Sequence, residues 1–458
     1  MEFAAVADLR LLLREIIDRH EISLKQYYDA ETGGFYHRHD EATPGKFSKS
    51  STATCVTSLL ATGAWHKKPW KDTGPKLLGN LLHAGWQRAK DAGVDSPELP
   101  PGSAGLPPGN PFTVAWLLDA VTALLILHPD QATADDHAAR IERAQQLLAD
   151  SVVENGGARI QGYPESAYVT QLVTRVLQKR TVLKTQPALV ERIRGWSERE
   201  MHRQLGLLTA GHKTGDAFQV AYAIVLIASL VPSDQAGPDD EVLLDAALAE
   251  FFRHQRPDGT WPLSRPLFHY PKVGSAHCFD YELLVQMLEV PRLSDKLLAF
   301  LPQLAKAAQA LKSTAFQLPK NGMGWSSGHH PQLRGPESWS TASVYHFAHA
   351  LERLVAKQVR HSTFAYLGAK YNETSRPDDY RQILAGFLDC EVKLGGKATP
   401  LKEVLSNRIL EPLIQQEDNG TIAAGRPLPK NVPMSMIFFG PPGTSKTRLA
   451  AIIAEALG

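Results

Sequence analysis

The chain has 458 residues, and its 49 Lys and Arg against 48 Asp and Glu give a formal net charge of +1. This balance, with no clustered basic stretch, excludes the strongly basic surface typical of nucleic-acid binders. Charged residues at 21% and hydrophobic residues at 43% indicate a folded chain rather than a disordered one. The length allows roughly two to four domains, or one large repeat-built domain with a smaller one.

Compartment and membrane signals are few. Cys55, Cys278 and Cys390 are too far apart in the sequence for a disulfide framework or a CxxC metal site, which suits a reducing compartment. Residues 1–15 contain no basic segment followed by an apolar run, so no signal peptide is predicted. The longest nearly apolar stretch, Phe218 to Val231, is too short to span a bilayer and predicts a buried helix. We therefore expect a cytoplasmic protein without a membrane span.

A recurring pattern runs along most of the chain: a Gly-rich loop, often with an aromatic residue, then a small or hydroxylated residue, then an apolar helix. It occurs in six places, and its equivalent points are Thr52, Thr113, Tyr168, Phe218, Phe279 and Thr341. The period is about 50–62 residues, which indicates a repeat architecture with room for two helices in each unit.

The helices of one repeat differ in character. The stretch from Ala217 to Leu230 is apolar nearly all round, so it must be surrounded by protein. The next stretch begins at Pro238 with three acids in its first turn, carries an apolar stripe, and ends near Arg253. Fully buried helices alternating with amphipathic ones predict a mainly α fold. We expect an (α/α)6 toroid over residues 1–355, with six inner helices ringed by six outer ones.

One loop carries a family resemblance. The segment Gln255 to Trp261, with Asp258 and Gly259 between them, resembles the Q-x-x-D-G-x-W element of squalene and terpene cyclases. Gly-Gly-Phe and Gly-x-Gly-x-Trp loops also occur in the related β-subunits of protein prenyltransferases. The Gln can close a helix end, the Trp can stack over it, and the Gly supplies the turn. The resemblance covers roughly residues 20–355 and concerns fold rather than chemistry.

The motifs that carry chemistry in that superfamily are absent. The chain has neither a D-x-D-D acid element nor a D-D-x-x-D magnesium element. Its acid pairs (Asp135-Asp136, Asp239-Asp240, Asp378-Asp379) fit helix starts. The zinc-ligand types near the expected loops do not follow the prenyltransferase spacing, so no metal site is predicted; they are His277, Cys278, Asp280, His346 and His349.

A toroid has a central cavity, and polar or aromatic residues early on the inner helices are the candidates to line its mouth. They are Trp116, Glu165, Tyr168, Asp216, Gln219, Asp280, Glu282 and Trp339. A protein, peptide or lipid ligand would bind there. The alternative is that these groups satisfy one another and the loop backbones.

The sharpest motif lies at the C-terminal end. Met434 to Phe439 has the composition of a buried strand, and residues from Arg448 to Leu457 have that of a helix. Between them lie Gly440, Pro441, Pro442, Gly443, Thr444, Ser445, Lys446 and Thr447. Strand, Gly-rich loop, Lys-Thr and helix together predict a P-loop that binds ATP, with Lys446 on the β/γ-phosphates and Thr447 on Mg²⁺. Ser445 replaces the more usual Gly.

Residues 398–458 resemble the start of an AAA ATPase module, because an amphipathic helix from Pro400 to Leu413 and a Gly/Pro-rich stretch precede the P-loop. Residues 356–397 are expected to form a helical connector, with a helix from Asp378 to Val392. The AAA resemblance implies a Walker B strand, a sensor and an arginine finger, none of which occurs before Gly458. We therefore expect the N-terminal portion of a longer protein, one that forms a homo-oligomeric ring.

The leading hypothesis is an AAA ATPase in which the toroid recognises a substrate or signal and ATP hydrolysis drives remodelling. Catalytic residues are not identified. The alternatives are a toroid enzyme of the cyclase, prenyltransferase or glycan-hydrolase type, and a toroid that senses a ligand without catalysis. An enzyme requires a carboxylate pair or a metal site in the cavity.

Overall fold

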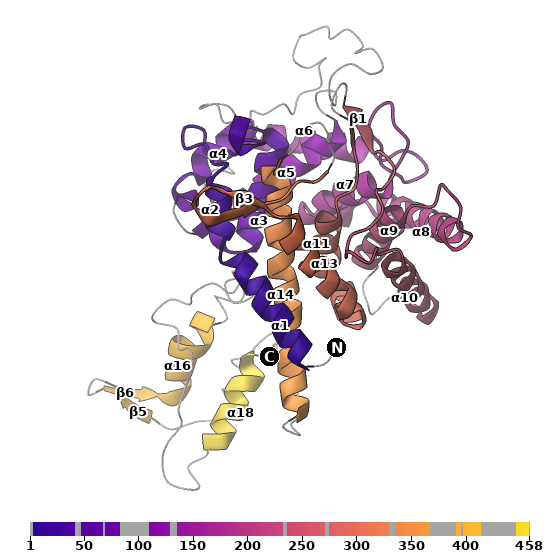
Figure 1. Ribbon diagram of the computed structural model, residues 1–458. Coiled ribbons are helices and arrows are strands. Elements are labelled where there is room, and N and C mark those ends of the chain that lie inside the picture. The colour runs from indigo at the N-terminus through magenta and orange to yellow at the C-terminus, as the bar shows by residue number, and fades with distance from the viewer. Residues whose placement is uncertain are drawn as a thin grey trace. The chain divides into compact units, whose positions relative to one another are not determined.

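The computed structural model describes residues 3–41, 47–66, 69–82, 110–128, 135–231, 236–270, 274–328, 335–366, 391–394, 397–413 and 446–457. These residues form two compact units, Met1–Val359 and Arg360–Gly458. The first unit is mainly α-helical and has the architecture of an α/α toroid (Figure 1).

Six helices of the described chain form a closed inner ring. They are α3 (Lys49–Ala61), α5 (Pro111–Leu127), α7 (Ala167–Lys179), α9 (Ala217–Leu230), α11 (Asp280–Glu289) and α14 (Ser338–Tyr366). Each of the first four packs against the next. The ring closes at α14, where the Ser58 hydroxyl on α3 donates to the Ala342 carbonyl at 2.8 Å. On its other side α14 meets α11, with the rings of Tyr281 and Phe347 5.2 Å apart.

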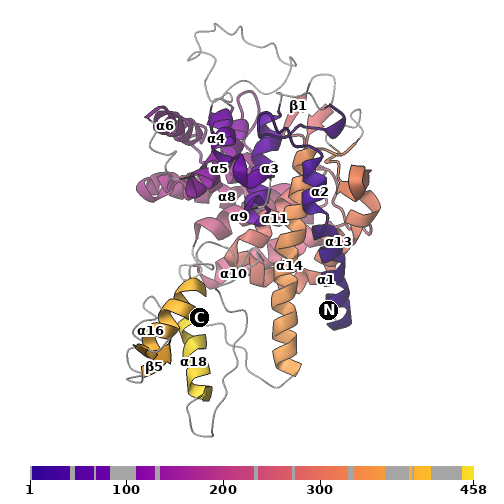
Figure 2. The same cartoon turned by 90° about the vertical axis from the view of Figure 1, so that its left-hand side faces the viewer.

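A second set of helices packs around this ring. They are α1 (Phe3–Ile17), α4 (Gly74–Leu82), α6 (Asp135–Asp150), α8 (Pro187–Thr209), α10 (Pro238–Arg253) and α13 (Leu301–Thr314). In Figures 1 and 2 the indigo helix α1 lies beside the orange helix α14, and Arg10 on α1 pairs with Glu352 on α14 at 2.9 Å. The start and the end of the repeat array are therefore joined.

Short elements connect the ring helices. Among the described residues they include the helices α2 (His20–Lys25) and α12 (Pro291–Leu297) and 3-10 turns at His39–Glu41, Ala64–His66, Trp70–Asp72, Val182–Thr185, Leu298–Phe300 and Pro319–Asn321. Two antiparallel hairpins pair β1 (Phe268–Tyr270) with β2 (Gly274–Ala276), and β3 (Phe316–Leu318) with β4 (Gly322–Gly324). The hairpin β1–β2 lies next to the start of α11 and brings Phe268 to the inner ring.

The contrast between inner and outer helices follows from the sequence. Every residue of α9 from Ala217 to Ala228 is buried, as its apolar composition predicts. The outer helix α10 begins at Pro238 and ends at Arg253, also as expected. Of the predicted apolar stripe, Ala247, Phe251 and Phe252 are buried. Val242, also predicted, is 68% exposed, and Leu244 is buried in the first half of the helix instead. Periodicity therefore located this helix and the C-terminal half of its buried face.

The loop from Gln255 to Trp261 acts as the cyclase resemblance implies. Gln255 Nε2 donates to the carbonyls of Gly259 and Gln303, both at 2.9 Å. The Trp261 ring stacks on Phe251 at 4.8 Å, and its Nε1 donates to the Phe251 carbonyl at 3.0 Å. Gly259 has φ of +88°, and a Cβ there would lie 2.3 Å from the Lys306 carbonyl oxygen. Only glycine fits this turn.

One kind of hydrogen bond anchors the Gly-rich loop in several repeats. A side chain in the first turn of an inner helix accepts a hydrogen bond from the backbone N–H that follows the Gly-rich loop. Thr52, Thr170 and Thr341 hold the N–H groups of Phe35, Ala158 and Trp325 at 2.8, 2.8 and 3.0 Å. In the fifth repeat Asp280 takes this place and accepts from Trp261 N at 3.2 Å. The repeated pattern in the sequence therefore mainly serves to attach each Gly-rich loop to the first turn of an inner helix. We call this hydrogen bond the loop latch.

The second unit contains a hairpin of β5 (Glu391–Leu394) and β6 (Lys397–Pro400), α16 (Leu401–Leu405), a π-helical turn (Ser406–Leu410) and α18 (Lys446–Leu457). Leu405, Leu410 and Ile453 form its small core. The predicted helices after Pro400 and from Lys446 are present, but Glu391 and Val392 belong to a strand rather than to a helix from Asp378.

The expected α/β AAA module is not seen in the described part of this unit, whose strands form only an antiparallel hairpin. The predicted strand from Met434 to Phe439 and the loop from Gly440 to Ser445 lie outside the described residues, as do the side chains of Lys446 and Thr447.

Within the described ranges, no helix combines the length and the apolar character that crossing a membrane requires.

Candidate functional site

The inner helices line two neighbouring pockets that share three lining residues. The first, which we call the aromatic pocket, holds about 570 Å³ of atom-free space, with the open solvent at its mouth included. It is lined by His37, Ser50, Ser51, Thr54, Phe112, Trp116, Tyr168, Leu267, Phe268, Ala276, His277, Glu282 and Trp339. The second, the charged pocket, holds about 470 Å³ of atom-free space counted in the same way. It is lined by Thr54, Thr57, Ser58, Ala61, Trp116, Asp119, Arg175, Lys179, Glu282, Val285, Gln286, Glu289, Ser343 and His346. Thr54, Trp116 and Glu282 belong to both pockets and mark their junction.

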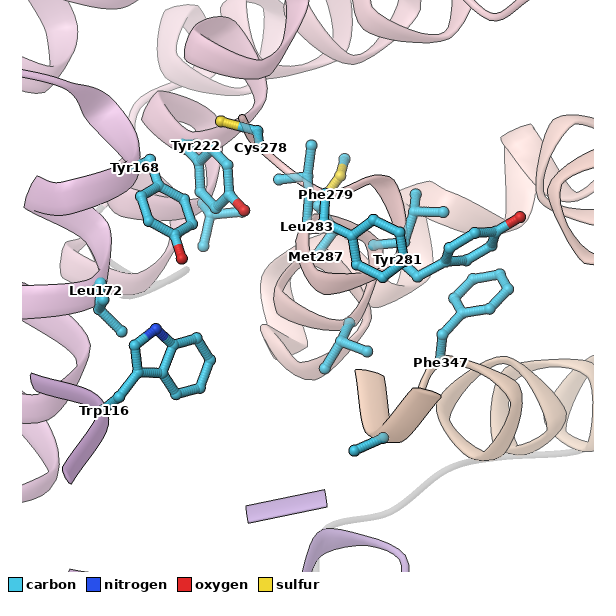
Figure 3. Packing of buried hydrophobic residues seen from close by; sticks show 14 of the residues in the cluster. Trp116, Tyr168, Leu172, Tyr222, Cys278, Phe279, Tyr281, Leu283, Met287 and Phe347 are labelled. Atoms are coloured by element: carbon cyan, nitrogen blue, oxygen red, sulfur yellow. The ribbon is translucent and has the colours of Figure 1, made fainter. Parts of the chain in front are cut away.

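The aromatic pocket lies at the N-terminal ends of the inner helices. Phe112 on α5 contacts Tyr168 on α7 at 6.0 Å and Phe268 on β1 at 5.3 Å, measured between ring centroids. Trp339, at the start of α14, meets Phe279 at 5.4 Å. Figure 3 shows the Trp116 and Tyr168 side chains on neighbouring helices, on the same side of the buried cluster. These rings give the pocket flat apolar walls.

Glu282 is the acidic group at the junction. It lies in the first turns of α11 and is 7% exposed. Burial raises its pKa to about 7, against the opposing effects of a hydrogen bond with Tyr168 and of the Arg175 charge. Burial also raises the pKa of the Tyr168 hydroxyl, so this group stays protonated and donates to the carboxyl group. Near neutral pH, Glu282 therefore exists in both protonation states within a cavity.

The charged pocket is organised by Asp119, the one charged residue in the sequence of α5. Its carboxylate is 2% exposed and contacts Arg175 at 3.0 Å and Lys179 at 2.7 Å, both on α7. The Arg175 guanidinium also lies 5.1 Å from the centroid of the Trp116 ring, at cation–π distance. Burial alone would raise the Asp119 pKa. The positive charges of Lys179 and then Arg175 outweigh this effect and hold the pKa below its ordinary value.

A second ion pair lies further along the charged pocket. Glu289 Oε1 on α11 is 2.6 Å from His346 Nε2 on α14. Burial alone would raise the Glu289 pKa, but His346, together with Lys179 and Arg175, lowers it to about 2. The Glu289 side chain is 35% accessible and lines the charged pocket. Three inner helices, α5, α7 and α11, thus contribute charges of both signs, and α14 contributes the histidine that contacts Glu289.

The structure places the sequence candidates in two groups. Trp116, Tyr168, Glu282 and Trp339 line the aromatic pocket. The other candidates line neither pocket; they are Glu165, Asp216, Gln219 and Asp280.

Asp216 caps α9 by accepting from Phe218 N at 3.0 Å, and its second oxygen accepts from Arg265 N at 2.9 Å. Gln219 accepts from Ala167 N at 2.7 Å. These contacts satisfy loop and helix-end amides, which is the alternative that the sequence left open.

Asp280 has a pKa raised to about 7, chiefly by burial, but its carboxylate holds Trp261 N in the latch described above. Glu165 lies 3.9 Å from Arg159 in a loop ion pair. A perturbed pKa alone therefore does not identify a site residue here, because Asp280 and Glu282 share that property and only Glu282 lines the pockets.

Sequence reasoning missed the charged pocket. Arg175, Lys179 and Glu289 sit late on their helices, whereas the candidates were sought early on theirs. One signal was available: Asp119 interrupts an otherwise uncharged apolar helix, and a buried acid requires a cation nearby.

Metal binding finds no support in the described residues, where no group of three or more His, Cys, Asp or Glu side chains could hold an ion. His277, Cys278 and His346 accordingly form no such group with their neighbours. The arrangement instead offers aromatic faces, balanced ion pairs and one carboxyl group that titrates near neutrality. It suits binding of a small polar molecule and proton transfer to or from it.

No protein-family model matches the chain, and no curated protein matches it. Among solved structures it is similar to a variant of the type II terpene cyclase MstE from Scytonema with merosterolic acid A bound: identity 14%, TM-score 0.43, covering 76% of this chain and 99% of that one. A glycosyl hydrolase family 88 protein from Bacteroides vulgatus has 12% identity and a TM-score of 0.42, covering 76% and 99%. A D-mannose isomerase has 10% identity and a TM-score of 0.46, covering 76% and 97%. These are resemblances of a mainly α toroid, and at such values they carry no argument about chemistry.

Proposed function

We propose that the toroid is an enzyme that binds a small polyhydroxylated molecule, such as a sugar ring, in the aromatic pocket and that Glu282 transfers a proton to or from it. The observation that carries this proposal is Glu282 itself. It is a buried carboxyl group with a pKa raised to about 7, at the junction of two pockets. A general acid or base works best when its pKa lies near the operating pH.

The walls favour a sugar over a hydrocarbon. A sugar ring presents flat C–H faces that pack on the rings of Trp116, Tyr168 and Trp339, and hydroxyl groups that pair with polar neighbours. An isoprenoid chain filling the same pocket would remove water from its polar residues His37, His277 and Glu282 without offering a hydrogen bond in return. Such desolvation is costly.

The test uses the full chain and a panel of monosaccharides and disaccharides. Binding is measured by titration calorimetry at pH 6, and conversion is followed by NMR. We expect at least one sugar to bind and be converted. Glu282→Gln, which keeps the shape and most hydrogen bonds, should lower kcat by at least about 100-fold.

Trp339→Ala should weaken sugar binding by about tenfold or more, because Trp339 lines the pocket and is only half-buried. The matched control is Trp261→Phe, a buried tryptophan outside both pockets. A panel in which no sugar binds, or binding that Trp339→Ala leaves unchanged, would overturn the proposal.

A second activity is proposed for the other unit: residues Gly440 to Thr447 bind MgATP. The support is the sequence motif together with α18, which begins at Lys446, where a P-loop requires a helix to start. Lys446→Ala should abolish ATP binding by the full chain, and Lys402→Ala, on α16, should not. Equal affinity of the Lys446→Ala variant and the parent would refute this assignment.

A further inference from the structure

The aromatic pocket contains a histidine whose tautomer is fixed. His277 Nδ1 lies 2.7 Å from the Ser264 carbonyl oxygen. A carbonyl oxygen only accepts hydrogen bonds, so Nδ1 must carry the proton of this contact. In the neutral imidazole, Nε2 is then the basic nitrogen. The Ser264 side chain strengthens the arrangement, because its hydroxyl accepts from Cys278 N at 2.8 Å and holds the next residue in place.

His277 is positioned to work with Glu282. It is half-buried in the segment that leads into α11, and Glu282 follows in the first turns of that helix. Both side chains line the aromatic pocket, together with Trp116, Tyr168 and Trp339. A base with a fixed tautomer and an acid that is protonated up to about pH 7 therefore share one cavity.

We propose that His277, through Nε2, is a second catalytic residue, and that the pair opens and closes the ring of a cyclic hemiacetal, the form in which aldose sugars exist. This inference rests on the proposed function, because it requires a sugar in the aromatic pocket. It assigns the reaction class that the pocket's two proton-transfer groups can perform without a metal or a redox partner.

Ring opening involves two proton transfers, one to His277 and one from Glu282. His277 Nε2 removes the proton from the anomeric hydroxyl, and the electron pair of that O–H bond forms the C1=O double bond. The bond between C1 and the ring oxygen breaks, and its electron pair stays on the ring oxygen. Glu282 gives its proton to that oxygen. The products are the open-chain aldehyde, a protonated His277 and an ionised Glu282, and closure of the ring reverses each transfer.

The pH dependence follows from the groups that face this pair. On the segment before α3 the neighbour is His37, on α7 they are Tyr168 and Arg175, and on α5 the charge is that of Asp119. Tyr168 stays protonated, and Arg175 and Asp119 form an ion pair. Activity should fall above about pH 7 as Glu282 ionises.

The experiment measures the interconversion of α- and β-anomers of aldoses by polarimetry, with the full chain and α-D-glucopyranose as the first probe. Galactose, mannose and xylose follow. We expect acceleration over buffer for at least one aldose. His277→Ala should lower kcat by about 100-fold with little change in KM, and added imidazole should restore part of the rate. Glu282→Gln should remove the decline in activity at high pH.

Two further variants separate chemistry from folding. His277→Asn keeps an N–H donor toward the Ser264 carbonyl but has no basic nitrogen, so it should remain folded and lose the same activity. His269→Ala is the matched control, because His269 lies on β1, is exposed and bonds to Ser275 at 2.7 Å outside both pockets. It should retain the parent rate.

The outcomes distinguish the two proposals. Sugars that bind and are converted equally well by the parent and by His277→Asn would overturn the role of His277 and leave the proposed function standing. Sugars that bind without accelerated anomer exchange would overturn the ring-opening assignment. Absence of any sugar binding would overturn both.

Discussion

The aromatic pocket and the charged pocket are built by the same inner helices, α3, α5, α7, α11 and α14, yet they hold opposite kinds of side chain. The N-terminal turns contribute rings and hydroxyls, and the later turns contribute ion pairs. Lys179 is the last residue of α7, where the helix dipole favours a cation. The sixth inner helix, α9, lines neither pocket and is buried along its length. One ring of helices thus carries aromatic rings and hydroxyl groups toward one end and ion pairs toward the other.

The charged pocket should matter most for stability. Asp119→Ala leaves Arg175 largely buried without its carboxylate, and breaking a buried pair in this way costs about 3–5 kcal/mol. Denaturant unfolding of the full chain measures the loss. The matched variant Lys179→Met should cost under about 1 kcal/mol, because Lys179 is 49% exposed. Similar losses of stability for both variants would contradict the stabilising role of the buried Asp119–Arg175 ion pair.

Trp116 joins the two pockets, so its removal should affect both. Trp116→Ala deletes a side chain that is 5% exposed and takes away the ring under Arg175. We expect a loss of about 3 kcal/mol in the free energy of unfolding, together with loss of sugar binding. Trp116→Phe keeps an aromatic face and should recover much of both. Stability lost with binding intact would show that the two pockets act independently.

The pH dependence of stability separates the two acids Glu282 and Glu289. The Glu282 pKa is raised from 4.5 to about 7 in the folded state. The contribution of Glu282 to the free energy of unfolding is therefore fully present below pH 4.5 and is lost as the pH rises through about 7. By the free energy of a pKa shift, this loss is on the order of 3 kcal/mol. Glu289 has a pKa lowered from 4.5 to about 2, so its contribution is present above 4.5 and is lost as the pH falls toward 2.

Glu282→Gln should therefore flatten the fall in melting temperature between pH 4.5 and 7 without abolishing it, since Asp280 has a pKa raised in the same direction. Glu289→Gln should leave the slope of the melting temperature between pH 4.5 and 7 unchanged. It should reduce the fall in melting temperature below pH 4.5. A slope above pH 4.5 that is identical in the parent and in Glu282→Gln would contradict the raised pKa of Glu282.

The smallest effect is expected outside the cavity. Trp261→Phe removes the hydrogen bond to the Phe251 carbonyl but keeps a ring to stack there. It should cost about 1 kcal/mol and leave sugar binding unchanged. An effect on binding would show that the loop latch and the pockets are coupled.

The sequence predicted the architecture better than the site. Repeats, the apolar helix α9, the limits of α10 and the roles of Gln255 and Trp261 are all local patterns, and the structure confirms them. The site candidates were mixed because position on a helix does not reveal the direction of a side chain within a ring. Asp280 and Glu282 are two residues apart and both acidic, but one latches a loop and the other faces the pockets.

The paired helices around a buried inner set could be predicted from the sequence, because hydrophobic periodicity and Gly-rich turns act over a few residues. The sequence also supplied the motif from Gly440 to Thr447, whose function is still a prediction. Which side chains meet depends on the tertiary structure. Asp119, Glu289 and His346 come from three different helices, and the contacts that lower the Asp119 and Glu289 pKa values form only when the ring closes.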